Sequence, residues 1–343
     1  MTTPVEFGLD TFGDVTVDAG GRPHTAAQVI RDVVEQGVLA DDVGVDAFGI
    51  GEHHREDFAV SAPDVVLTAI AARTTRIRLG SAVTVLSSDD PIRVFQRFST
   101  LDAISGGRAE ITVGRGSFVE SFPLFGYGLE DYEVLFSEKL DLFAELLRER
   151  PVTWSGTVRP PLAGARVFPP TESGGLRTWV GVGGSTASVI RAATYGLPLM
   201  IAIIGGSADR FVPLADLYRA ALEQQGLAPL PIGVHSPGHV AATDEQAVEE
   251  FWPGYLSGMT RIGAERGWPP PTRLRFDDEV AAGSLYVGSP ETVARRIAAT
   301  VATLGLRRFD LKYATGPMPH AQLMSSIELY GSRVVPLVRD LLA

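Results

Sequence analysis

The sequence predicts an α/β fold, a (β/α)8 or TIM barrel with insertions, and three observations lead to this prediction. Eight short apolar runs rich in β-branched residues are separated by amphipathic stretches of helical length. Strand followed by helix, repeated eight times over 343 residues, is typical of a parallel barrel with insertions. The run Phe48–Gly51 also ends abruptly in Glu52, His53 and His54, as a buried parallel strand does where its carboxyl end opens into a site.

The eight expected strands are residues 5–9, 47–51, 77–86, 109–114, 178–182, 197–204, 232–242 and 308–315. The expected helices are residues 25–39, 61–73, 132–148, 208–223, 244–267, 290–304 and 320–342. In the first helix the valines and the isoleucine recur at helical spacing and share one face. The second begins with a capping-box-like Ser61 and has Pro63 just inside it, which is typical of a helix start.

Insertions are expected after strand four (residues 117–131), before strand five (151–176) and after strand seven (253–289). The middle one contains Pro160–Pro161 and Pro169–Pro170 and resembles a linker. It could therefore separate two doubly wound domains. The interpretation we prefer is one barrel domain over residues 1–343.

Composition excludes several functions. A net charge of -11 disfavours binding to a phosphate backbone, so no nucleic-acid partner is expected. There is no signal peptide and no run of eighteen apolar residues, so we expect a cytoplasmic protein without membrane association. The chain has no cysteine, which rules out disulfides and thiolate chemistry.

Adjacent imidazoles at the end of the second strand could exchange protons or bind a metal. Equally, either His53 or His54 could point into the loop and hydrogen-bond the backbone. On the seventh strand, His235 and His239 are four residues apart and would share a face. Pro237 and the glycine after it favour a bend, and packing explains this pair better than a metal site does.

A phosphate site is the second expectation. Arg115 follows strand four between two glycines, so a cation and bare amides can approach an anion. Strand five runs through Gly183, Gly184 and Ser185 into a helix that contains Ser188, and a helix N-terminus favours a phosphate. The alternatives are an arginine paired with a surface acid and a serine that only caps its helix.

Three segments together resemble the bacterial luciferase-like family of flavin-dependent monooxygenases, which are (β/α)8 barrels. They are Glu52–His54, residues 80–93, and residues 101–116 with Ser-Gly-Gly-Arg followed by Gly-Arg-Gly. The resemblance implies that His53 assists catalysis near the reactive edge of the flavin. It also implies that Ala82, Val83 and Thr84 support the ring, with a cis peptide at Ala82–Val83.

The same resemblance implies that Arg115, Gly183, Gly184, Ser185 and Ser188 hold the flavin phosphate. The sequence departs from luciferase at Gly184, where luciferase has a glutamate, and at Gly114, where it has a cysteine. These changes put light emission and a long-chain aldehyde substrate in doubt.

We therefore expect an FMN-dependent monooxygenase that uses reduced FMN and dioxygen on an unidentified small organic substrate, in which Glu52 orients His53. No nucleotide-binding unit for NADH is visible, so a separate flavin reductase is expected, and the resemblance implies a homodimer. A deazaflavin-dependent oxidoreductase on the same barrel is the first alternative. The others are a metal-dependent hydrolase using all four histidines named above, and a flavin-binding protein without catalysis.

The substrate should be apolar or aromatic if the aromatic residues of the first insertion line the site. These are Phe118, Phe122, Phe125 and Tyr127, together with the loop 205–211. The alternative is that the same aromatic residues only pack the insertion onto the barrel.

Overall fold

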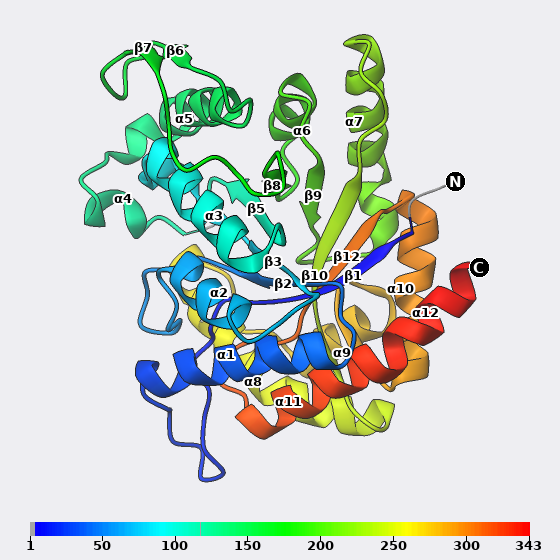
Figure 1. Cartoon of the computed structure of the whole chain (residues 1–343). Helices are drawn as coiled ribbons and strands as arrows, with labels where there is room; N and C mark the ends of the chain where they lie inside the picture. Colours follow the sequence, from blue (N-terminus) through cyan, green and yellow to red (C-terminus); the bar gives the residue numbers. More distant parts are fainter. Residues whose placement is uncertain (1–3, 117) are drawn as a thin grey trace.

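The computed structural model describes residues 4–116 and 118–343. Its eight main strands are all parallel and lie in the order β1–β2–β3–β5–β8–β9–β10–β12, with β12 pairing β1 to close the barrel (Figure 1). The predicted (β/α)8 barrel is therefore confirmed. β5 and β8 are hydrogen-bonded across the middle insertion, so that insertion does not separate two sheets.

The barrel strands are β1 (Glu6–Thr11), β2 (Ala47–Ile50), β3 (Arg78–Ser81), β5 (Ala109–Gly114), β8 (Arg177–Val182), β9 (Leu199–Ala202), β10 (Ile232–Val240) and β12 (Arg308–Lys312). The others are β4 (Thr84–Val85), which pairs β5, β11 (Tyr286–Gly288), which pairs β10, and the antiparallel hairpin β6 (Val152–Trp154) and β7 (Leu162–Ala165).

The α-helices are α1 (Ala26–Asp42), α2 (Pro63–Ala71), α3 (Pro91–Ser105), α4 (Ser121–Leu124), α5 (Tyr132–Leu146), α6 (Thr186–Thr194), α7 (Val212–Gln224), α8 (Asp244–Arg266), α9 (Arg273–Ala282), α10 (Pro290–Leu304), α11 (His320–Leu329) and α12 (Val335–Leu342). Short 3-10 turns are η1 (Leu86–Ser88), η2 (Leu129–Asp131) and η3 (Ala208–Phe211), and a π turn, η4 (Tyr330–Val334), joins α11 to α12.

The insertions have structure of their own. The first holds α4 and η2, the second forms the β6–β7 hairpin beside α5, and α9 and β11 lie within the third (Figure 1). α8 continues through Pro253, so the third insertion starts later than the sequence predicted. The expected long third strand is split into β3 and β4, because the chain turns at the cis peptide Ala82–Val83.

Charged side chains occupy part of the barrel interior, and glycines make room for them. A Cβ on Gly80 would lie 2.7 Å from Cγ of Glu110, so only glycine fits opposite that carboxylate. Arg308 is fully buried and donates to Glu110 (2.9 Å), Glu6 (3.2 Å) and Asp310. Burial raises the pKa of Asp310 to about 6, even though Arg308 favours its charged form. The interior below the strand ends is therefore polar, whereas the strand–helix layer is apolar.

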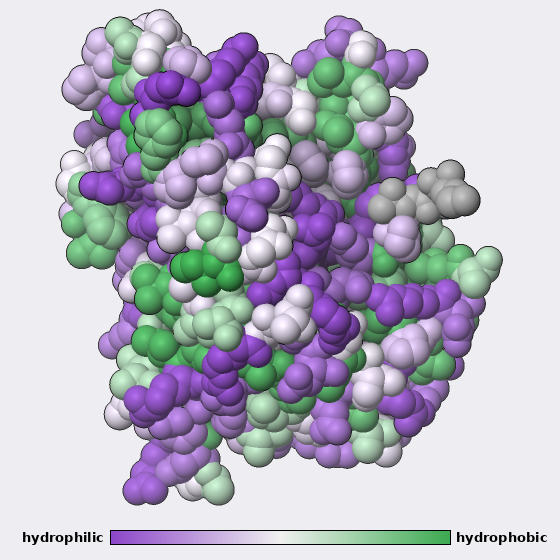
Figure 2. Space-filling model, in the orientation of Figure 1, coloured by the Kyte–Doolittle hydropathy of each residue, from purple (hydrophilic) through white to green (hydrophobic). Residues whose placement is uncertain are grey.

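The face of the molecule in Figure 2 is largely hydrophilic, with hydrophobic residues in separate patches. None of the helices described is long and apolar enough to cross a membrane.

Candidate active site

Two adjoining cavities open at the carboxyl ends of the barrel strands. The strand-end cavity, of about 440 Å³, is lined by residues from all eight barrel strands, which are β1, β2, β3, β5, β8, β9, β10 and β12. The α8 cavity, of about 950 Å³, lies against α8 and the start of α9. They share six lining residues, which are Phe12, Phe118, Gly183, Ile204, His235 and Arg266. A ligand in one cavity can therefore meet a ligand in the other.

The predicted phosphate residues come together at one wall of the strand-end cavity. Nη2 of Arg115 donates to Oγ of Ser188 (3.2 Å), and Ser185 caps α6 by accepting from the backbone N–H of Ser188 (3.4 Å). Arg115 also contacts the carboxylate of Glu133 and lies over the ring of Tyr132. Barrel closure thus places a cation, two hydroxyls and a helix N-terminus around one spot, as an anion site requires.

The glycines of this wall differ in position. A Cβ on Gly183 would meet no atom within 4 Å, and Gly183 lines both cavities, so this position leaves space for a ligand. Gly184 has φ +121°, a conformation that L side chains rarely adopt. Gly184 does not line either cavity. Its part is to turn the chain from β8 into α6.

The cis peptide Ala82–Val83 is present, and both residues line the strand-end cavity. Gly114 and Gly181 pack on the side chain of Val83, because a Cβ on them would lie 2.8 Å and 2.9 Å from its methyl groups. Glycine in place of the luciferase cysteine at position 114 is therefore what the bulk of Val83 requires. Thr84 does not line either cavity, since its hydroxyl is buried and donates to Oγ of Ser81 (2.8 Å).

His53 lies on the wall of the strand-end cavity in an aromatic cage. Its ring packs at centroid distances of 4.6 Å from Phe12, 4.4 Å from Phe58 and 5.2 Å from Phe118. Burial lowers the pKa of His53 to about 3, and the positive charge of Lys312 adds to this effect. His53 is therefore a neutral imidazole at pH 7. The expectation that it exchanges protons near neutral pH does not fit this environment.

Glu52 does not orient His53. Its Oε1 lies 2.9 Å from Nε2 of His54, and its Oε2 accepts from the backbone N–H of Val85 (2.9 Å). Glu52 is buried, so it fixes the segment after the cis peptide against the end of β2. His54 is its partner and is more than a simple loop residue.

The aromatic residues of the first insertion do not line the site as a group. Phe118 borders both cavities, and Ser117 beside it lies outside the described residues. Phe122 is fully buried against Tyr132, Phe125 is half exposed, and Tyr127 packs on Lys139. Of the loop 205–211, Gly205 lines the α8 cavity. α8 supplies seven of the residues that line that cavity, and Trp268, Pro269 and Pro271 supply three more, which the sequence did not indicate.

Sequence reasoning also missed the charged end of the strand-end cavity. Asp10, Glu110, Arg308 and Asp310 line it, and His235 Nδ1 lies 2.6 Å from Oδ2 of Asp10. The sequence does contain a signal for this charged group, because Asp10 places a carboxylate near the carboxyl end of the buried strand β1, two residues before Phe12.

The four histidines of the metal-hydrolase alternative do not converge. His54 pairs with Glu52, His235 with Asp10 and His239 with Glu250, while His53 is caged by aromatic rings. Within residues 4–116 and 118–343, no group of three or more His, Asp or Glu side chains could hold a metal ion. That alternative has no support in the described site.

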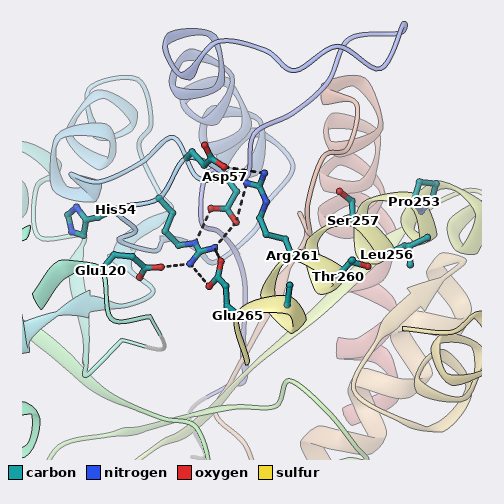
Figure 3. A pocket seen from close by; sticks show the side chains of 12 residues that line it. His54, Asp57, Glu120, Pro253, Leu256, Ser257, Thr260, Arg261 and Glu265 are labelled. Carbon is teal, nitrogen blue, oxygen red and sulfur yellow. Dashed lines mark hydrogen bonds and ion pairs between the residues drawn. The ribbon is translucent and has the colours of Figure 1, made fainter. Parts of the chain in front are cut away.

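A third pocket, of about 900 Å³, adjoins the site and is shown in Figure 3. Arg55 lines it and joins three segments through Asp57 (3.0 Å), Glu120 and Glu265 (2.8 Å). Its guanidinium also lies 4.5 Å from the ring centroid of Phe118. Arg55 therefore fastens the first insertion and α8 to the loop after β2, and it holds Phe118 against His53.

A parallel barrel with a two-part cavity at its strand ends has the arrangement of a TIM-barrel enzyme, whose active site lies at the carboxyl ends of the strands. The model of the family described as luciferase-like monooxygenase matches residues 11–308. The chain belongs to this family.

A curated relative and a solved structure that are similar to this chain are also monooxygenases by name. The chain is 29% identical over 239 residues to 4-hydroxyprotoasukamycin monooxygenase of Streptomyces nodosus subsp. asukaensis, covering 67% of this chain and 64% of that protein. The crystal structure of monooxygenase RslO1 from Streptomyces bottropensis matches with a TM-score of 0.82 and 24% identity, over 96% of this chain and 99% of that one.

Two further structures share the fold at lower identity. The oxygenating constituent of 3,6-diketocamphane monooxygenase of Pseudomonas putida, in complex with FMN, has a TM-score of 0.78 and 18% identity, covering 97% of this chain and 98% of that one. An F420-dependent secondary alcohol dehydrogenase has a TM-score of 0.75 and 17% identity, covering 98% and 100%.

Proposed function

We propose that the protein is an FMN-dependent monooxygenase that acts with reduced FMN and dioxygen on a small organic substrate. The observation that carries this proposal is the anion site formed by Arg115, Ser185 and Ser188 at one wall of the strand-end cavity. A phosphate there would leave the ring of FMN beside the cis peptide, in a cavity that opens into a second one.

The residues present fit this cofactor. Arg115 and Ser188 would hold the phosphate, and the open space beside Gly183 would admit it. Ala82 and Val83 would support the ring from the β3–β4 turn. Glu110, Arg308 and Asp310 also line this cavity, where they could satisfy polar edges of a bound ring.

Reduced FMN supplies the electrons that activate dioxygen. The chain supplies a site that excludes water, since Phe12, Phe58 and Phe118 enclose His53. Because His53 is neutral, its ring can donate or accept a hydrogen bond at the reacting centre without bringing in a charge.

The test is a binding comparison. Reduced FMN, oxidised FMN and reduced F420, a deazaflavin, are titrated anaerobically into the protein, and the complexes are then mixed with dioxygen. Tight binding of reduced FMN followed by oxygen incorporation into a substrate supports the proposal. Binding of F420 in preference to FMN, with no consumption of dioxygen, would instead establish the deazaflavin-dependent oxidoreductase.

Two partners belong to the same proposal. A separate reductase would deliver reduced FMN, and the protein would act as a homodimer. Sedimentation that shows only a species of 36.6 kDa would contradict the dimer. Reduction of bound FMN by NADH without added reductase would contradict the first partner.

A further inference from the structure

Asp10 and His235 form a hydrogen-bonded pair where the two cavities meet. His235 is on β10 and lines both cavities, whereas Asp10 is on β1 and is almost fully buried. The Oδ2 of Asp10 lies 2.6 Å from Nδ1 of His235. A carboxylate can only accept, so Nδ1 carries the hydrogen and Nε2 of the neutral ring is an acceptor.

No residue among those described bonds to Nε2 of His235, so this acceptor is available to a ligand. The other charged groups beside it are engaged. Lys312 is bonded to Asp14 (3.1 Å), and Asp310, which is level with His235 on the neighbouring strand, is bonded to Arg308.

Besides these paired charges, aromatic and apolar side chains lie near His235. Its ring is nearly parallel to that of Phe12, with a centroid distance of 5.9 Å and an interplanar angle of 13°, and Phe12 also packs on His53 at 4.6 Å. The α8 cavity continues this surface with further apolar side chains, which are Phe58, Phe118, Ile204, Met259, Trp268 and Leu285. A ligand that satisfies both features has a flat apolar body and one hydrogen-bond donor.

We propose that the Asp10–His235 pair binds the hydroxyl group of a phenolic substrate and accepts its proton. This rests on the proposed function, because it takes the α8 cavity as the substrate's place. The O–H bond breaks with its electron pair left on the oxygen, the proton goes to Nε2 of His235, and the carboxylate of Asp10 stabilises the imidazolium. A phenol, with a pKa of about 10, is acidic enough for this exchange, and its phenolate is an electron-rich ring.

In this arrangement His235 touches the substrate, and Asp10 is a positioning residue. A cavity built to bond a hydroxyl group discriminates against an analogue without it, because the acceptor is then left unpaired. The matched probes are 4-nitrophenol and 4-nitroanisole, which differ only in that the hydroxyl is methylated. The phenolate of 4-nitrophenol also has a visible absorption band, and the titrations are made at a pH below the pKa of the free compound, so that phenolate formed on binding reports proton transfer.

The experiment titrates both compounds into the flavin-free protein and into His235→Gln, Asp10→Asn and His320→Gln. The parent should bind 4-nitrophenol at least about tenfold more tightly than 4-nitroanisole, and partly as the phenolate. His235→Gln should lose both the preference and the phenolate band, and Asp10→Asn should weaken the band. His320→Gln, whose side chain bonds Gln36 and lines neither cavity, should match the parent.

Equal binding of the two compounds by the parent, no binding of 4-nitrophenol, or a full phenolate band in His235→Gln would each overturn the proposal. A urea unfolding midpoint close to that of the parent shows that each variant is folded, and FMN binding by the parent tests the proposed function separately. If FMN fails to bind while the two nitro compounds behave as stated, the phenol site stands and the cofactor assignment falls.

Discussion

The assignment of the phosphate site depends on Arg115, and its neighbour Glu133 makes a test with two opposite signs possible. Arg115 contacts the carboxylate of Glu133, which also accepts from Arg191 (3.1 Å). A flavin phosphate would take the place of Glu133 as the anion nearest Arg115. Arg115→Ala should therefore weaken FMN binding, and Glu133→Gln should strengthen it because a competing anion is removed.

Arg115→Ala should change the Kd for FMN more than Glu133→Gln does, because the ion pair between Arg115 and Glu133 is exposed to solvent and weak. A charge-assisted hydrogen bond to a phosphate contributes about 1.5–3 kcal/mol, so Arg115→Ala should raise the Kd for FMN about 10- to 150-fold. The side chain of Glu133 is 61% exposed, and an exposed ion pair is worth only about 0.2–1 kcal/mol. Glu133→Gln should therefore lower the Kd only about 1.4- to 5-fold.

The assay is the quenching of flavin fluorescence, with FMN and riboflavin titrated in parallel at low and high salt. Riboflavin has no phosphate, so neither variant should change its Kd by more than about twofold. Arg150→Ala is the matched control, because Arg150 is an exposed arginine whose one ion pair among the described residues is with Glu145. Equal losses of FMN and riboflavin affinity in Arg115→Ala would show that Arg115 is structural and that the phosphate binds elsewhere.

Three further predictions follow from the walls of the site. His53 takes up a proton in the unfolded chain below about pH 6.5 but not in the folded protein until about pH 3, so stability falls as pH decreases. Between pH 7 and pH 5 the parent should lose about 2 kcal/mol more free energy of unfolding in urea than His53→Gln, and equal losses would contradict the burial argument. Glu52→Gln should lower the free energy of unfolding in urea by about 1–2 kcal/mol, because it weakens the hydrogen bond that the carboxylate accepts from the buried backbone N–H of Val85. An unchanged urea midpoint would mean that this hydrogen bond does not stabilise the turn between β3 and β4. Arg55→Met should speed amide hydrogen exchange in residues 118–125 and in no barrel strand. The control Arg73→Met, which breaks an exposed ion pair, should leave exchange in residues 118–125 unchanged. Exchange rates in Arg55→Met that match the parent would show that Arg55 does not hold the first insertion in place.

The elements that the sequence predicted well are those with a local signal. The helix expected at 290–304 is α10 with the same limits, because Ser289 caps it, Pro290 begins it and a glycine ends it. The approach of Arg115 to Ser188 could also be predicted, because parallel strands β5 and β8 are neighbours and both residues follow their carboxyl ends.

The parts that could not be predicted depend on tertiary packing. Which aromatic residue of the first insertion faces the cavity is decided by Arg55 and the cage around His53, and no periodicity encodes that choice. The Asp10–His235 pair joins residues 225 positions apart across the closure of the barrel. In the sequence, each of the two residues is only a polar position in an expected strand. They can pair because β12 lies between β1 and β10 in the closed barrel.

The imidazoles of His53 and His235 both pack on Phe12, but their surroundings differ, and we therefore propose different roles for them. His53 is caged by three aromatic rings and has no carboxylate partner among the described residues, so burial keeps it neutral. His235 has a carboxylate at 2.6 Å, which stabilises the charged form of the ring if it takes up a proton. The proposed site would therefore combine one neutral imidazole with one proton acceptor, and both rings pack on Phe12. In the proposed phenol site, Asp10 holds the hydrogen on Nδ1 of His235 and so leaves Nε2 as the atom that faces the ligand.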